Sequence, residues 1–155
     1  MKKIISLILC AVILCGSLAA CGKGTQAPPL SELYAQVEEV TNMPPLYVMG
    51  ENFIETMFGF DLSAFEEYVF AEAEDASVYA DVVILVKLAD GTDVNAVCET
   101  LEVYLNGVRE NTESYSPENY AKAEQSSVCV SGDYVYLVIT EQYDEAMQII
   151  TNALK

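Results

Sequence analysis

The sequence of 155 residues predicts an α+β fold, in which N-terminal helices precede an antiparallel sheet of about four strands with helices packed on it. Apolar residues alternate with polar ones in four segments, as they do in half-buried strands. In other segments they recur three and four residues apart, as in amphipathic helices, and turn residues separate the two kinds. After the N-terminal helices the order is β-β-α-β-β-α, which favours a sheet with its helices stacked on one face.

Two helices and two strands are expected in the first half of the domain. They are helices at 31–40 and 51–58 and strands at 67–74 and 78–88. The first helix ends before Pro44 and Pro45, because the residue before a proline disfavours helical backbone. The second helix ends at Gly59, since glycine readily adopts the left-handed conformation found after a helix.

The second half of the domain begins with a long helix. It is expected to run from Thr92 or Asp93 to about Asn111, because Asp90-Gly91 turns the chain and either residue can cap the helix. The elements after it are a turn at 115–118 that can continue as a short helix to 123, strands at 126–131 and 133–140, and a last helix at 144–154. The two strands form a hairpin around Ser131-Gly132-Asp133.

The first twenty residues have the layout of a secretory signal. Basic Lys2 and Lys3 precede the apolar run Ile4–Cys15, and small residues then lead to Cys21. The tetrapeptide Leu18-Ala19-Ala20-Cys21 resembles the lipobox of bacterial lipoproteins. This resemblance implies that the Cys21 thiol receives a diacylglyceryl group and that the chain is cut before it. The protein would then be anchored in the cell membrane, on the extracytoplasmic side.

We therefore expect three parts: a signal peptide at 1–20, a flexible tether at 21–30 and a single α+β domain at 31–155. The tether is expected because glycine, proline and polar residues dominate that stretch. The alternative is an uncleaved membrane helix at Ile4–Cys21, which reaches the lower limit of about 18 apolar residues for a span.

The chain is strongly acidic, with 7 Lys and Arg against 24 Asp and Glu and a net charge of −17. Loss of Lys2 and Lys3 with the signal would leave 5 basic residues and a net charge of −19. This charge argues against a nucleic-acid partner, because binding to phosphates needs basic patches. It also repels an anionic leaflet, so we expect contact with the membrane through the lipid on Cys21 alone. The other expected partner is an envelope protein or a cationic ligand.

The chain contains no histidine, which removes Ser-His and Cys-His catalytic pairs and histidine-ligated metals. Acidic residues gather at Glu66-Glu67, at Glu72-Glu74-Asp75 and at Asp90 with Asp93. None of these groups has the loop spacing of a calcium site, so we interpret them as solvated charge. A carboxylate pair can hydrolyse glycosides, but among 24 acidic residues some pair meets any required separation. We therefore expect no catalytic residues, no metal and no cofactor.

Two cysteines lie outside the leader and the anchor, Cys98 and Cys129. Cys98 lies on the apolar face of the long helix. Cys129 alternates with Val128 and Val130 and therefore points away from the face that these valines bury. If the long helix packs on the valine face, the two sulfur atoms lie on opposite sides of the sheet and form no disulfide.

Tyrosine is abundant, with 10 residues. Alternation places aliphatic residues on one sheet face, the expected core: Val69, Ala71, Val82, Ile84, Val86, Leu88, Val135, Leu137 and Ile139. It places four tyrosines on the other face, together with further apolar residues: Tyr68, Tyr79, Tyr134 and Tyr136. A face this apolar is either covered by the N-terminal helices or used for binding. The four tyrosines are therefore a candidate interaction face.

Several segments of residues 30–154 resemble the family that carries domain of unknown function 4358, found in small lipoproteins of Gram-positive anaerobes. The segments are Ser31-Glu32-Leu33, Phe58-Gly59-Phe60-Asp61, the strand from Asp81 to Lys87, Tyr115-Ser116-Pro117-Glu118 and the closing strand from Gly132 to Ile139. Family members often carry an acidic residue before the central strand, which Asp81 matches here. They also carry an Arg or Gln in the long helix, where this chain has Tyr104 and Val108. The resemblance implies no activity.

Three functions fit these observations. The expected one is a lipid-tethered binding or adaptor domain of the cell envelope. The alternatives are a structural or regulatory lipoprotein without a ligand, and a carboxylate-based hydrolase. An uncovered tyrosine face favours binding, a covered face favours the structural role, and a deep cleft with two convergent carboxylates favours the hydrolase.

Overall fold

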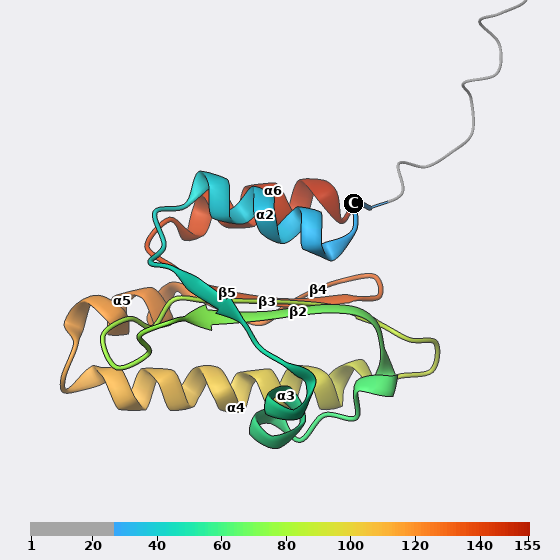
Figure 1. Cartoon of the computed structure of the whole chain (residues 1–155), viewed down its shortest axis with the longest axis horizontal. Helices are drawn as coiled ribbons and strands as arrows, with labels where there is room; N and C mark the ends of the chain where they lie inside the picture. Colours follow the sequence, from blue (N-terminus) through green and yellow to red (C-terminus); the bar gives the residue numbers. More distant parts are fainter. Residues whose placement is uncertain (1–26) are drawn as a thin grey trace, which may run out of the picture.

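A computed structural model describes residues 27–155, which form a five-stranded antiparallel sheet between two layers of helices (Figure 1). The strands are β1 (Leu46–Val48), β2 (Phe65–Ala73), β3 (Val82–Leu88), β4 (Cys129–Ser131) and β5 (Tyr134–Ile139). Their order across the sheet is β1-β2-β3-β5-β4. The α+β class and the antiparallel sheet are confirmed, with one strand more than expected. The expected signal peptide, Cys21 and the part of the expected tether before residue 27 lie outside the described residues.

The helices cover both faces of the sheet (Figure 1). They are α2 (Leu30–Val40), α3 (Glu51–Phe58), α4 (Val94–Glu113), α5 (Pro117–Gln125) and α6 (Tyr143–Ala153), with a short 3₁₀ turn at Leu62–Ala64. Helices α2 and α6 lie side by side on one face, and α4 lies on the other. The expectation that helices stack on one face is therefore wrong, because the sheet is apolar on both sides. No helix within residues 27–155 is both long and apolar enough to cross a membrane.

The central strand β3 explains the two layers. Six of its seven residues are buried, and they contribute alternately to two apolar clusters. Val82, Ile84 and Val86 pack toward α4, whereas Val83 and Leu85 pack toward α2 and α6. A strand that is buried on both sides is a near-continuous apolar run, as this one is. The hydrophobic effect therefore holds a helix layer on each face.

Local signals in the sequence fix most helix ends as expected. Gly59 ends α3 with a positive φ of 71°. Asp93 caps α4, since its carboxylate accepts a hydrogen bond from the Asn95 amide at 3.0 Å. Ser116 caps α5, and Pro117 occupies the first turn, where a missing N–H costs nothing.

The β2–β3 connection differs from the prediction. The predicted strand at 78–88 begins only at Val82, because residues 74–81 form a turn. In it the amides of Val78 and Tyr79 both donate to the Asp75 carbonyl, at 3.0 Å each. Strand β1 was not expected, and with three residues it is too short to give a clear alternation.

The two cysteines lie on opposite faces of the sheet, as strand alternation predicts. Cys98 packs against the cluster under α4, and Cys129 packs against the cluster under α2 and α6. Both are free thiols. The sheet between them keeps the sulfur atoms apart.

Candidate functional site

The four tyrosines of the candidate interaction face do not share a face. Tyr134 and Tyr136 point toward α2 and α6, and Tyr136 is only 4% exposed. Tyr68 lies on the opposite face, where its hydroxyl donates to the Glu51 carboxylate at 3.2 Å. Tyr79 is not in a strand but on the β2–β3 turn, and it is 41% exposed. The prediction that the four tyrosines share one sheet face is therefore wrong. The alternative was that the N-terminal helices cover the predicted tyrosine face. It is confirmed for α2, which together with α6 covers Tyr134 and Tyr136.

The cause is the register of β2. Tyr68 pairs with Val86 and Phe70 pairs with Ile84, which puts these aromatic side chains on the face of α4. Directly paired residues share a face, so Val69 and Ala71 go to the other side with their partners. The sequence predicts alternation within β2, but a one-residue shift against β3 reverses both faces. Both sides of β2 are apolar, so hydrophobicity does not select between them.

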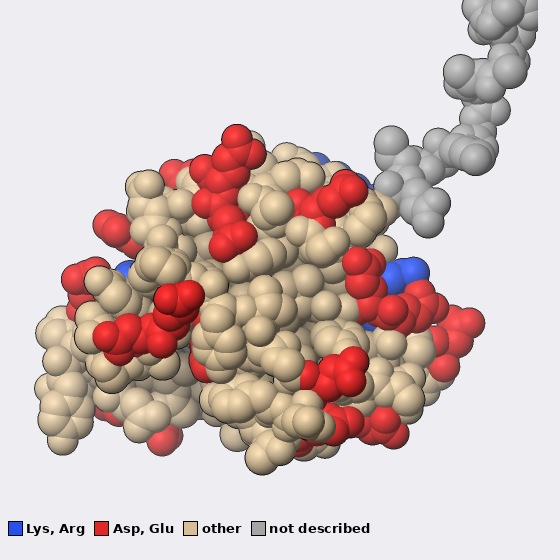
Figure 2. Space-filling view, viewed as in Figure 1, with Lys and Arg blue, Asp and Glu red and all other residues tan. Residues whose placement is uncertain are grey.

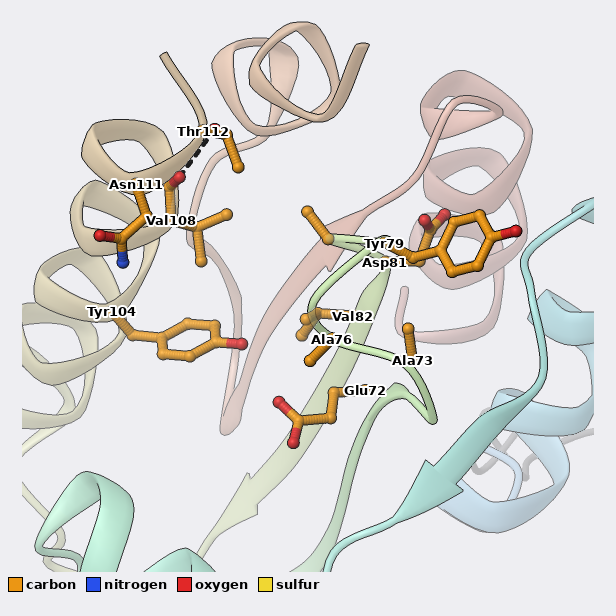
Figure 3. A pocket seen from close by; sticks show the side chains of 11 residues that line it. Glu72, Ala73, Ala76, Tyr79, Asp81, Val82, Tyr104, Val108, Asn111 and Thr112 are labelled. Carbon is orange, nitrogen blue, oxygen red and sulfur yellow. Dashed lines mark hydrogen bonds between the residues drawn. The ribbon is translucent and has the colours of Figure 1, made fainter. Parts of the chain in front are cut away.

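A pocket lies at the end of the molecule where β2 turns into β3 (Figure 3). We call it the distal pocket, because the chain enters the domain near the opposite end, at the start of α2 (Figure 1). Its volume is about 160 Å³. It is lined by the end of β2, the turn, the start of β3 and the C-terminal half of α4: Glu72, Ala73, Ala76, Tyr79, Ala80, Asp81, Val82, Tyr104, Val108, Asn111 and Thr112.

Helix α5 holds the turn that forms one wall of the pocket. The buried side chain of Asn119 donates to the Val78 carbonyl at 2.8 Å and accepts from the Ala80 amide at 3.3 Å. These bonds satisfy the backbone of a turn that has no sheet partner there. Arg109 of α4 in turn donates to the carbonyls of Ala123 and Ser126 at the end of α5, at 3.1 and 2.7 Å. A cation at a helix C-terminus is favourable. Hydrogen bonds therefore connect α4 to α5 and α5 to the turn that lines the pocket.

A buried ion pair involves Asp81, one of the residues that line the pocket. The Lys122 ammonium of α5 donates to the Asp81 carboxylate at 2.9 Å, and these residues are 7% and 2% exposed. The exposed Glu118 carboxylate lies 3.7 Å from the same ammonium. Burial of one charge without its partner is costly, so the two residues stabilise each other. The acidic residue before the central strand is thus a paired, buried group.

Two further polar groups face the pocket from opposite walls (Figure 3). The Glu72 carboxylate accepts a hydrogen bond from the Tyr47 hydroxyl of β1 at 2.9 Å. The Tyr104 hydroxyl of α4 points into the space in front of Glu72, and its ring packs against Phe58 at 5.1 Å between centroids. Burial, with the nearby Glu72 charge, raises the pKa of Tyr104 well above its usual range. The Tyr104 hydroxyl is therefore neutral at physiological pH.

The acidic groups singled out in the sequence have mostly structural roles. Glu66 pairs with Lys87, Glu67 accepts from the Leu30 amide at 2.6 Å, and Asp93 caps α4. No group of three His, Cys, Asp or Glu side chains within residues 27–155 could hold a metal ion. Glu72 lines the distal pocket together with Asp81, but unlike Asp81 it has no cationic partner among the described residues.

Sequence reasoning missed Glu72 and Tyr104 as pocket residues and Lys122 as the partner of Asp81. Glu72 was grouped with the charges of the following turn, and Lys122 carried no signal in its own segment. The best signal was the resemblance to a family, since Asp81, Tyr104 and Val108 were compared with family positions and all three line the pocket. Only Tyr79 among the candidate tyrosines belongs to it.

Comparison with known proteins gives one match. Residues 39–140 match the family model described as "Domain of unknown function (DUF4358)". Searches of the curated proteins and of the solved structures found no significant similarity. The matched region runs from the end of α2 to the end of β5 and includes every residue that lines the distal pocket. It is well over half of the chain, and the chain therefore belongs to the family of domain of unknown function 4358.

Proposed function

We propose that the chain is a lipid-anchored binding domain of the bacterial cell envelope, without catalytic activity, that holds its ligand at the distal pocket. The observation that carries this proposal is the position of the pocket, at the end of the domain opposite the start of α2 (Figure 1). A chain anchored at its N-terminal side would present that end to its surroundings.

The length of the tether supports this orientation. Nine residues, 21–29, separate the proposed lipid on Cys21 from the start of α2. Nine extended residues span about 30 Å at most. The domain would therefore stay close to the bilayer, with the α2 end toward the lipid and the distal pocket away from it.

The distal end also carries exposed side chains suited to contact. Val78, Tyr79 and Tyr115 are 52%, 41% and 90% exposed. Tyr115 lies two residues after the end of α4, and its amide donates to the carbonyl of Thr112, which lines the pocket. Tyrosine combines a large apolar ring with a hydroxyl that stays hydrated, so it serves well as a contact residue.

The charge of the surface supports a basic partner. All 24 acidic residues lie within residues 27–155, which contain four basic ones: Lys87, Arg109, Lys122 and Lys155. Figure 2 shows acidic side chains spread over the visible face and few basic ones. Such a field attracts cationic molecules and repels acidic ones, more weakly as salt is raised.

A structural or regulatory lipoprotein without a ligand is the second candidate. Coverage of both sheet faces by helices favours it, because within residues 27–155 neither face of the sheet is left open for a partner. A hydrolase has less support. Its two carboxylates in the pocket would be Glu72 and Asp81, and Asp81 is already bound to Lys122.

In-cell photo-crosslinking tests the proposal. A photoreactive amino acid replaces Tyr79 or Tyr115 at the distal end, or Val130 on β4 as a matched control. Val130 is 50% exposed and lies in the β4–β5 hairpin, near the opposite end. We expect one crosslinked species to form from positions 79 and 115 and not from 130. Crosslinks equally strong from all three positions, or from none, would contradict the binding role.

A Cys21→Ala variant tests the anchor in the same cells. The lipobox resemblance predicts that the wild type incorporates labelled palmitate and fractionates with membranes. In the variant, residue 21 carries no lipid, so palmitate labelling and membrane association through that lipid should both be lost. A Cys98→Ala variant is the control, because Cys98 lies in α4 of the domain. Persistent lipid labelling of Cys21→Ala would show that the anchor is assigned to the wrong residue.

A further inference from the structure

We propose that the distal pocket binds an alkylammonium group, from a small amine or from a lysine side chain of a protein partner. This inference rests on the proposed binding function and names the chemistry of its ligand. Four properties of the pocket lead to it: its volume, an uncompensated carboxylate, a free hydroxyl and an apolar wall.

The volume suits a small organic group. A dry cavity of about 150 Å³ takes a molecule the size of benzene. At about 160 Å³ the distal pocket matches the end of a lysine side chain or a short alkylamine, and it is partly open to solvent. It is too small to enclose a nucleotide or a disaccharide.

The carboxylate of Glu72 supplies an unmatched negative charge. Within residues 27–155 the ion pairs join Lys87 with Glu66 and Lys122 with Asp81 and Glu118. None of them reaches Glu72, whose described partner is the neutral Tyr47 hydroxyl. A half-buried carboxylate loses part of its hydration, and here no ion pair compensates for that loss. A ligand cation at this position would form a charge-assisted hydrogen bond with Glu72 and neutralise its charge.

The hydroxyl of Tyr104 is free to accept a hydrogen bond. It forms no hydrogen bond with the described residues, and it points into the pocket (Figure 3). An ammonium group has three N–H donors and no acceptor. Glu72 and Tyr104 offer acceptors for these donors from opposite walls of the pocket (Figure 3).

Apolar residues beside these acceptors fit the rest of an alkylamine. Ala76, Val82 and Val108 line the same pocket and would contact the methylene groups. A metal ion is less suitable, because it needs several ligand oxygens around one point and the described residues contain no such group. An anion is disfavoured, since the nearby cations Lys122 and Arg109 are bonded to Asp81 and to the end of α5.

Binding to the full chain in detergent, followed by NMR or calorimetry, tests the proposal. The probes are pentylamine, the neutral analogue pentanol, the peptide Gly-Lys-Gly with blocked ends, and the same peptide with an acetylated lysine. We expect saturable binding of pentylamine and of the lysine peptide, and none of pentanol or the acetylated peptide. Tighter binding of the peptide would identify a protein lysine as the source of the ammonium, and tighter binding of pentylamine a small amine.

Glu72→Gln is the decisive variant, with Glu74→Gln as its matched control. Glu74 is an exposed acid two residues further along the chain and does not line the pocket. We expect amine affinity to fall at least about tenfold in Glu72→Gln and to stay unchanged in Glu74→Gln. Tyr104→Phe should weaken binding by a smaller factor. The melting temperature of each variant checks that the fold is intact.

Two results would overturn the inference. One is pentanol binding as tightly as pentylamine, and the other is amine affinity that survives Glu72→Gln. Either would leave the proposed function standing if crosslinking from Tyr79 and Tyr115 persists. If crosslinking and anchoring fail but the amine still binds through Glu72, the proposed amine site is supported and the proposed role in the cell envelope is wrong.

Discussion

At the scale of single residues, three of the four cations within residues 27–155 bond to groups on neighbouring elements. Arg109 binds the carbonyl groups at the end of α5, and Lys87 pairs with Glu66 across β2 and β3. Lys122 is buried and pairs with Asp81, which lines the distal pocket. Because these cations hold elements together, the surface keeps its negative charge. The same use of cations leaves Glu72 without one.

The Asp81–Lys122 pair leads to a prediction about stability. Lys122→Met would leave the Asp81 carboxylate buried and uncompensated, which costs about 3–5 kcal/mol of unfolding free energy. The double variant Asp81→Leu/Lys122→Met removes both charges and should recover most of that loss, because an apolar replacement of a buried pair is often neutral. Urea denaturation measures both values.

Lys155→Met is the control for this pair. Lys155 is exposed at the C-terminus and bonds to Asn152, so its loss should change the free energy by less than about 0.5 kcal/mol. A Lys122→Met variant as stable as this control would mean that the ion pair does not contribute to the fold.

At the scale of elements, the register of β2 decides which side chains reach which layer. Strand β2 has Tyr68 and Phe70 on one side and Val69 and Ala71 on the other, and both sides suit a core. The connecting turn determines the register of a hairpin, and the backbone of the turn at 74–81 is bonded to the Asn119 side chain of α5. That contact joins residues about forty positions apart, so the local sequence does not reveal it.

The positions of the helices were more predictable than the register of β2. A helix is stabilised by bonds within its own segment and by caps at its ends, so Gly59 and Asp93 could be recognised locally. The candidate site was less predictable. Its walls come from β2, the turn and α4, and only tertiary packing brings Glu72 and Tyr104 together.

The layer formed by α2 and α6 leads to a second prediction. Tyr136 lies under this layer and is 4% exposed, so Tyr136→Ala should cost about 3–5 kcal/mol, as large aromatic truncations do. Tyr115→Ala, at a position 90% exposed, should change stability by less than about 0.5 kcal/mol. Thermal and urea unfolding of the two variants give the comparison. An unchanged melting temperature for Tyr136→Ala would restore Tyr136 as a candidate contact residue.

At the scale of the whole molecule, the dominant property is excess negative charge. The described residues carry 24 acidic and four basic side chains, and three of the four basic ones are committed to bonds within the fold. Like charges repel each other more in the compact state than in the unfolded chain, so this excess lowers the free energy of unfolding. The apolar layers on both faces of the sheet offset that repulsion.

Screening of this repulsion gives the last prediction. Raising the ionic strength from 0.01 M to 0.15 M shortens the Debye length from about 30 Å to about 8 Å. We expect the melting temperature to rise over this range, by roughly 3–5 °C for each kcal/mol gained. Sodium and potassium chloride should act alike, because screening depends on ionic strength and not on the identity of the ion. Calcium chloride at the same ionic strength distinguishes general screening from binding of a cation at a specific site. A large additional stabilisation by calcium would mean that some acidic residues form a cation site and are not merely solvated charge, whereas equal curves for all three salts support self-repulsion as the cause.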